Sequence, residues 1–164
     1  MLARLDQRLL YAMRTRAHGP AIEALGRALG RFGEYGIGWL VIGVALALAD
    51  SDQRDAWLVA GILGPVGIGL NYAVKVMVRR PRPVLEGLPP LGGAPSSLSF
   101  PSAHGTSSFA CATAMTRIAP EAAILFLLAA AIAACRPYLG MHYPSDVLGG
   151  VLLGTGLGLL VPLP

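Results

Sequence analysis

The sequence predicts an all-α integral membrane protein. We expect a helical bundle of about five transmembrane helices, preceded by an N-terminal amphipathic helix in the membrane interface. Charged residues form 13% of the 164-residue chain, whereas they form about 25% of an ordinary soluble domain. Hydrophobic residues form 54%, and most of them gather in five segments separated by polar or Pro- and Gly-rich stretches. The alternative is a soluble all-α protein whose helices are buried.

The N-terminal region has the pattern of a helix that lies flat on a membrane. Leu2, Leu5, Leu9 and Met13 fall on one helical face, with arginines elsewhere around the helix. This period fits an amphipathic interfacial helix, and a second short helix is expected after Pro20. The chain has the length of one domain. We divide this domain, residues 1–164, into an interfacial arm, 1–32, and a transmembrane core, 33–164.

Several of the five apolar segments are shorter than the roughly 20 residues that span a bilayer core. Their shortness suggests that their polar ends dip into the membrane. In the last segment, Gly150, Gly154 and Gly158 repeat every fourth residue, a spacing that lets transmembrane helices approach closely. We favour packing within the monomer over a homodimer interface as the use of these glycines. The segments cover about residues 33–49, 56–78, 102–118, 121–136 and 145–162.

Three short motifs lie at the ends of these segments. Alternating spans would bring all three motifs to one side of the membrane. The cations Lys75, Arg82 and Arg136 would then converge on one anion, and guanidinium groups give bidentate contacts to phosphate. Each cation taken alone would also suit the end of a helix. The motifs read Lys75-x6-Arg82-Pro83, Pro101-Ser102-Ala103-His104 and Arg136-x5-His142-x3-Asp146.

The second motif predicts the start of a helix, because Ser is a good N-cap and Pro favours a helix start. The first amides of this helix would point at an anion, helped by the helix dipole. His104 beside such a turn would serve as a general acid for a leaving oxygen. The amides concerned are those of Ser102, Ala103, His104 and Gly105.

The third motif places Asp146 one helical turn after His142. The carboxylate would reach Nδ1 of the imidazole and leave Nε2 free as a nucleophile. Two histidines and an aspartate can also bind a metal. We disfavour that chemistry, because the surrounding cations would repel a divalent ion and suit an oxyanion. We therefore expect neither a metal nor a cofactor.

The order and spacing of the motifs resemble the signature of the type 2 phosphatidic acid phosphatase superfamily, which also includes vanadium haloperoxidases. The resemblance covers residues 75–146, and Cys135 stands where the third motif usually begins with serine. It implies a helical bundle with the active site at one end.

The resemblance also implies hydrolysis of a phosphomonoester or diphosphate without a metal. His142 would attack phosphorus, His104 would protonate the departing oxygen, and water would then release phosphate from the phosphohistidine. Electrostatic stabilisation of the transferring group would dominate such a reaction. The phosphate-binding groups would be Lys75, Arg82, Arg136 and the amides of Ser102, Ala103 and Gly105.

A site beside the bilayer implies a lipid substrate. The stretches Arg31–Trp39 and Ser96–His104 are similar to small actinobacterial enzymes of cell-wall synthesis, which dephosphorylate polyprenyl-phosphoryl 5-phosphoribose such as decaprenylphosphoryl-5-phosphoribose. The alternatives are phosphatases of polyprenyl (undecaprenyl or decaprenyl) diphosphate, phosphatidylglycerol phosphate or phosphatidate, and a non-enzymatic protein that binds or transports lipid phosphates. We expect the membrane and its lipids as partners, and no nucleic acid.

The connection of residues 79–101 joins the first motif to the second and is rich in Pro and Gly. Connections of this length are uncommon without a role, so we expect it to cover or border the active site. Arg79 and Arg80 at its start are interpreted as surface charges near anionic lipid headgroups.

Charge distribution predicts which side of the membrane the site faces. Residues 50–55 are net acidic, whereas the first 31 residues hold six arginines against Asp6 and Glu23. Because cytoplasmic flanks carry the excess of Lys and Arg, we expect the N-terminus in the cytoplasm. With five spans the active site would face the cytoplasm too, in a multi-pass protein of the bacterial plasma membrane.

Overall fold

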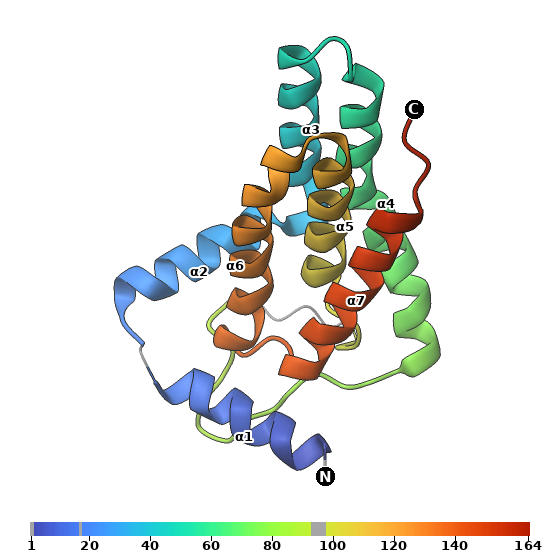
Figure 1. The fold of residues 1–164 in the computed structure, drawn as a ribbon. Coiled ribbons are helices and arrows are strands. Elements are labelled where there is room, and N and C mark those ends of the chain that lie inside the picture. The colour runs from blue at the N-terminus through green and yellow to red at the C-terminus, as the bar shows by residue number, and fades with distance from the viewer. Residues whose placement is uncertain (1, 17, 93–97) are drawn as a thin grey trace.

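The computed structural model describes residues 2–16, 18–92 and 98–164, and these residues form helices and connections without a strand (Figure 1). The all-α prediction is therefore confirmed. Ser96 and Ser97 of the stretch that resembles actinobacterial phosphatases lie outside the described residues. The helices are α1 (Leu2–Thr15), α2 (Pro20–Phe32), η1 (Glu34–Gly36), α3 (Ile37–Ala49), α4 (Arg54–Val78), α5 (Ala103–Ile118), η2 (Pro120–Ile124), α6 (Leu125–Tyr138) and α7 (Pro144–Leu160).

Helix α5 forms the centre of the bundle, where it packs against α4, α6 and α7. Most of its residues are buried, including Thr106, Ser107 and Ser108. These hydroxyls find partners inside the protein: the Trp39 indole nitrogen, for example, donates to Ser108 Oγ at 3.0 Å. Because protein surrounds α5, its sequence can be more polar than that of a lipid-facing helix.

The glycine repeat of α7 packs against α5 inside the same chain, as predicted. Gly150, Gly154 and Gly158 are buried, and a Cβ atom on any of them would meet the α5 backbone or the residue that caps it. The close contact brings the start of α5 onto the first turn of α7. There the Ser102 amide donates to the Asp146 carbonyl at 2.9 Å. Small residues thus position two of the predicted motifs.

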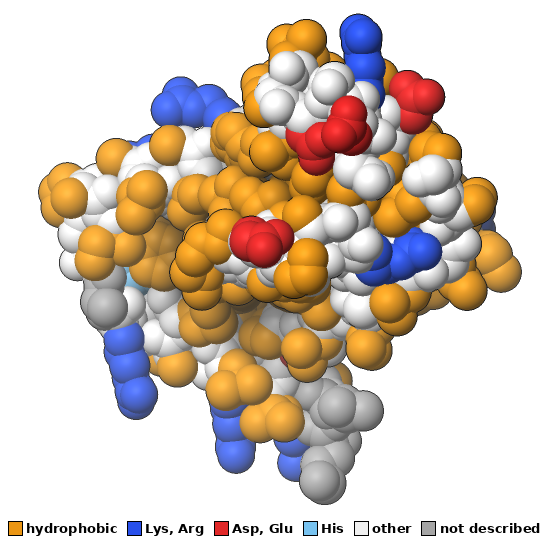
Figure 2. Space-filling model, turned by 45° about the horizontal axis from the view of Figure 1, so that its top comes forward, with side chains coloured by type: hydrophobic (Ala, Val, Ile, Leu, Met, Phe, Trp, Pro, Cys, Tyr) orange, Lys and Arg blue, Asp and Glu red, His pale blue; other side chains and the backbone are white. Residues whose placement is uncertain are grey.

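The outer helices have the apolar surface of a membrane protein. Leu48, Leu127 and Leu152 are 74%, 68% and 75% exposed, and hydrophobic side chains cover much of the face seen in Figure 2. So large an apolar surface would be unfavourable in water. The protein is therefore an integral membrane protein, as the composition predicts.

Fewer helices than the five expected are individually long and apolar enough to cross a bilayer. Among the described residues, 54–78 and 120–138 qualify, and α2 with η1–α3 would form one further span bent by 50°. Helix α7 is apolar but shorter, at 17 residues. The five-span topology and the boundary of the arm at residue 32 therefore stay predictions.

Helix α1 lies across the end of the bundle at which the three motifs meet (Figure 1). Its inner face buries Asp6, Leu10 and Arg14, while Leu5 and Leu9 are exposed. The outward leucines fit the predicted contact with a membrane interface. The inward face is polar at both ends, which the leucine period does not indicate.

The α5–α7 packing predicts a clear difference between two glycines of α7. Gly154→Ala should lower the stability by about 1–3 kcal/mol, because its methyl group would press on the Thr106 carbonyl. Gly156 has no atom within 4 Å of its added Cβ, so Gly156→Ala should leave the protein as stable or slightly more stable. Thermal unfolding of the two purified variants in detergent would test this, and equal melting temperatures would contradict the packing.

Candidate active site

The structure brings the three predicted motifs together at one end of the bundle. Arg82 Nη1 donates to the Met141 carbonyl at 2.7 Å and lies 3.4 Å from Nε2 of His142. On the other side of the imidazole, Nδ1 lies 3.6 Å from Oδ2 of Asp146. The first motif thus contacts the third directly, on the nitrogen that was predicted to be the nucleophile.

His142 lies in the loop between α6 and α7 and is 2% exposed. Desolvation lowers its pKa to about 4, and the positive charges of Arg82, Arg136 and Lys75 act in the same direction. The Asp146 carboxylate opposes them and raises this pKa. The imidazole is therefore neutral near pH 7, as a nucleophile requires.

Asp146 is fully buried in the first turn of α7 and is held by several donors. Arg80 Nη1 donates to Oδ1 at 2.7 Å. Oδ2 accepts from Ser99 Oγ at 2.5 Å and from the Tyr143 amide at 2.8 Å. The carboxylate faces His142 as predicted, but 3.6 Å is too long for a hydrogen bond. Such contacts often tighten only when substrate is bound.

The interpretation of Arg80 as a surface charge is wrong. Its guanidinium bridges Asp146 and Asp6 of α1, each at 2.7 Å, and lies 4.3 Å above the ring of Tyr143. Arg79 remains exposed. Neither the motif spacing nor the charge count distinguishes these neighbours, since the difference lies in what each side chain meets after folding.

Sequence reasoning also missed Asp6 and Ser99. Asp6 shares the buried face of α1 with Leu10, one helical turn later. A carboxylate on the buried face of a helix could have indicated a partner inside the protein, because carboxylates are rarely buried without one. Ser99 belongs to the connection between the first two motifs. Its contact with Asp146 shows that the end of this connection borders the site, as predicted.

The two other predicted phosphate-binding cations are buried beside this centre. Among the described residues, Arg136 Nε is a buried donor without a hydrogen-bond partner. Lys75 donates from Nζ to the carbonyls of Leu98 and Ser99, at 2.7 and 3.3 Å. An ammonium has three donors, so Lys75 can hold the connection and still contribute to an anion site. An incompletely satisfied buried guanidinium suits an anionic ligand.

The start of α5 agrees with the sequence in part. Ser102 is its N-cap, and the side chain accepts from the Gly105 amide at 3.4 Å. The Ser102 amide, predicted to bind phosphate, instead donates to the Asp146 carbonyl. The glycine-mediated approach of α7 causes this difference. The Gly105 amide, also predicted to bind phosphate, donates to this cap instead. The amides of Ala103 and His104 remain, since the first amides of a helix lack an intrahelical acceptor.

His104 lies against the end of α2, where Nε2 is 2.8 Å from the Gly30 carbonyl oxygen. Because a carbonyl only accepts, this contact requires a proton on Nε2. His104 and Arg136 line a cavity of about 390 Å³, which is bordered on the α2 side by Arg27, Arg31 and Glu34. The cavity therefore joins the second and third motifs to a charged edge of the N-terminal arm.

Potential metal ligands do not cluster here: within the described parts of the chain, no group of three or more His, Cys, Asp or Glu residues has a suitable arrangement. The charges that gather around His142 are those of Arg82, Arg136 and Lys75. Such a set of donors is complementary to a phosphoryl group rather than to a cation.

Known proteins are similar to this chain in sequence. Decaprenylphosphoryl-5-phosphoribose phosphatase of Mycobacterium tuberculosis is 42% identical over 142 residues, which cover 87% of this chain and 80% of that protein. Undecaprenyl-diphosphatase BcrC of Bacillus subtilis is 33% identical over 115 residues, or 68% and 58% of the two chains.

The fold also matches a solved structure, the transmembrane PAP2 type phosphatidylglycerolphosphate phosphatase of Bacillus subtilis. The TM-score is 0.75 at 24% identity, over 97% of this chain and 83% of that chain. The family model described as "PAP2 superfamily" matches residues 55–163, a range that includes all three motifs. With its motifs, its helical fold and its relatives in agreement, the chain belongs to the PAP2 superfamily.

Proposed function

We propose that this protein is a metal-independent phosphatase of membrane lipid phosphates that works through a phosphohistidine at His142. One observation carries the proposal: a buried, neutral imidazole has a guanidinium 3.4 Å from Nε2 and a carboxylate behind Nδ1. A phosphate bound by Arg82 would therefore lie beside the nucleophilic nitrogen.

In this mechanism Nε2 of His142 attacks phosphorus in line, and the ester bond to the leaving oxygen breaks as the nitrogen–phosphorus bond forms. Arg82 and Arg136 stabilise the charge on the equatorial oxygens, together with Lys75 and the first amides of α5. Asp146 stabilises the imidazolium that the attack produces. Water then attacks phosphorus and releases inorganic phosphate, which restores the imidazole.

His104, as an imidazolium, supplies the proton for the leaving oxygen and becomes a neutral imidazole. In the structure this imidazole uses Nε2 to contact the Gly30 carbonyl. During the reaction, the leaving oxygen takes the place of that carbonyl as the acceptor. The same imidazole, now without its proton, then activates the hydrolytic water.

The substrate we propose is a polyprenyl-linked phosphate such as decaprenylphosphoryl-5-phosphoribose. The similarity to the mycobacterial phosphatase of this lipid supports the choice, since the aligned region covers 87% of the chain. The cavity beside His104 supports it too, because Arg27 and Arg31 at its edge suit the second phosphate of such a lipid. Undecaprenyl diphosphate is the second candidate. It also carries two phosphates, and the Bacillus relative named for it is 33% identical.

A panel of lipid phosphates tests the function directly. Purified protein in detergent and EDTA should release phosphate from decaprenylphosphoryl-5-phosphoribose faster than from undecaprenyl diphosphate, phosphatidylglycerol phosphate or phosphatidate. His142→Ala should abolish release, and Asp146→Asn should reduce it by up to about 10⁴-fold, because the imidazole loses its carboxylate.

Asp52→Asn, in the loop between α3 and α4, is the matched control for these variants and should retain full activity. A strict metal requirement would contradict the mechanism. Binding of the lipids without release of phosphate would favour the non-enzymatic alternative.

The lowered pKa of His142 predicts the acid side of the pH profile. The neutral, reactive imidazole predominates above its pKa of about 4, so the logarithm of kcat/KM should fall only as the pH approaches that value. Initial rates between pH 4 and 9, with the stability of the protein checked at each pH, would test this. An acid limb near 6.5, the ordinary value for histidine, would contradict the proposed environment of His142.

We also propose a multi-pass topology with the active site facing the cytoplasm of a bacterial plasma membrane. In a Glu86→Cys variant, the introduced thiol should react with an impermeant maleimide only after the membrane is permeabilised. The native Cys111 and Cys135 are buried, so they should contribute little background. Labelling in intact cells would show that the site faces the outside of the cell, and it would favour the diphosphate substrate.

A further inference from the structure

A chain of alternating charges connects α1 to the proposed catalytic carboxylate. We propose that Asp6 and Arg80 are positioning residues for the reaction: Asp6 orients Arg80, and Arg80 orients the Asp146 carboxylate that faces His142. This inference rests on the proposed phosphatase mechanism. It assigns a role in catalysis to the N-terminal arm, which the three motifs do not include.

The contacts of Arg80 define the geometry. Nη1 donates to Asp146 Oδ1 and to Ser145 Oγ, each at 2.7 Å, and Nη2 donates to Asp6 Oδ2 at 2.7 Å. One planar guanidinium thus spans two carboxylates from helices at opposite ends of the sequence. The ring of Tyr143, 4.3 Å below the guanidinium, supports its orientation.

Burial makes these contacts stronger than ordinary surface ion pairs. Asp6 is 6% exposed and Asp146 is not exposed at all, while the Arg80 side chain is 26% exposed. Burial tends to raise the pKa of Asp6, but hydrogen bonds from Arg80 and Ser145 outweigh it and lower this pKa. Asp6 is therefore ionised, and the bridge is charged at both ends.

The arrangement explains how Asp146 can orient and stabilise the His142 imidazole while it is also bound to Arg80. Arg80 occupies Oδ1, which leaves Oδ2 on the side of His142. Arg80 alone would offset the negative charge of Asp146 and weaken its effect on the imidazole. Asp6 compensates the charge of Arg80, so the three groups together retain one negative charge to stabilise the imidazolium of the phosphoenzyme.

A purely structural role for Asp6 is the competing explanation. Its Oδ1 accepts from the Ser145 amide at 3.0 Å, and the Ser145 hydroxyl also donates to this carboxylate. Asp6 therefore caps the start of α7 and anchors α1. Such an anchor would affect stability, but it would not act on kcat through Arg80.

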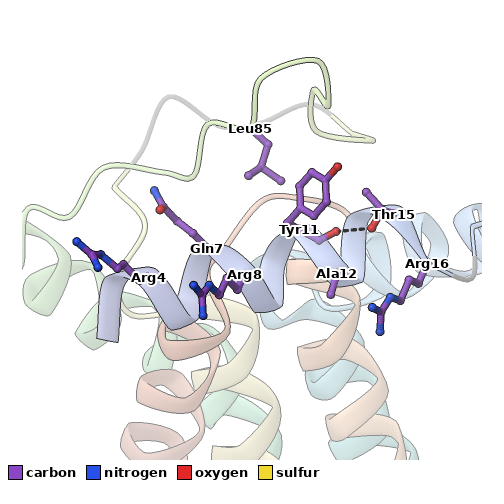
Figure 3. A pocket seen from close by; sticks show the side chains of 8 residues that line it. All are labelled: Arg4, Gln7, Arg8, Tyr11, Ala12, Thr15, Arg16 and Leu85. Carbon is purple, nitrogen blue, oxygen red and sulfur yellow. Dashed lines mark hydrogen bonds between the residues drawn. The ribbon is translucent and has the colours of Figure 1, made fainter. Parts of the chain in front are cut away.

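The outer face of α1 offers a matched control. Figure 3 shows Tyr11 beside Leu85, with Arg8 and Arg4 farther along the same helix, and all four residues line a separate cavity of about 500 Å³. Arg8 lies on the same helix as Asp6, two residues away, and is exposed to solvent. Arg8→Ala should therefore leave kcat and KM unchanged.

A double-mutant cycle separates the two explanations. Asp6→Asn should lower kcat about tenfold, and Arg80→Ala about a hundredfold, as expected when a reacting group is misplaced. KM should change by less than about twofold, because neither residue binds substrate. In the Arg80→Ala background, Asp6→Asn should have no further effect on kcat, because its influence passes through Arg80.

Rates of phosphoenzyme formation in single turnovers, with the melting temperature of each variant, complete the test. Unchanged kcat in Asp6→Asn, additive losses in the double variant, or losses that follow only the melting temperature would overturn the inference. Should Asp6→Asn fail to fold, Arg80→Lys decides the matter. Lysine keeps the positive charge but lacks the planar guanidinium that donates to both carboxylates. Wild-type kcat in this variant would equally overturn the inference. If the wild-type protein releases no phosphate, the proposed function fails instead.

Discussion

A carboxylate removed from water must find its hydrogen bonds inside the protein, and Asp146 is such a group. Its donors come from three separate segments: Arg80 after α4, Ser99 before α5, and the Tyr143 amide at the start of α7. Arg80 and Tyr143 lie within the first and third motifs, and Ser99 lies just before the second. Satisfying one buried charge therefore also determines how the ends of the central helices meet.

The close packing of α5 and α7 makes this convergence geometrically feasible. Without side chains at Gly150 and Gly154, the α7 backbone can approach the start of α5, and the Ser102 amide bonds to the Asp146 carbonyl. That contact removes one amide from the predicted anion site. It also holds the first turn of α5 rigidly beside the carboxylate. Rigid elements of this kind are better suited than mobile loops to position catalytic groups.

The basic residues around His142 have two effects that support each other. Arg82, Arg136 and Lys75 can bind the oxygens of a phosphate, and the same positive charges help to keep the imidazole neutral. In the proposed mechanism, a cationic site would therefore select both the anionic substrate and the reactive form of the nucleophile. Asp146 balances this effect, since it stabilises the imidazole only once positive charge has developed on the ring.

The sequence alone determined the helical class, the approximate ends of the helices and the identity of the motif residues. These features depend on local patterns: apolar periodicity, the Ser102 cap and the spacing of charged residues at helix ends. Only the tertiary structure decided that Arg80 forms a bridge between two buried carboxylates while Arg79 is exposed, and that Asp6 lies near Asp146. Hydrogen bonds between residues 74 or 66 positions apart leave no periodic signal, because they arise only when α1, the connection after α4 and α7 pack together.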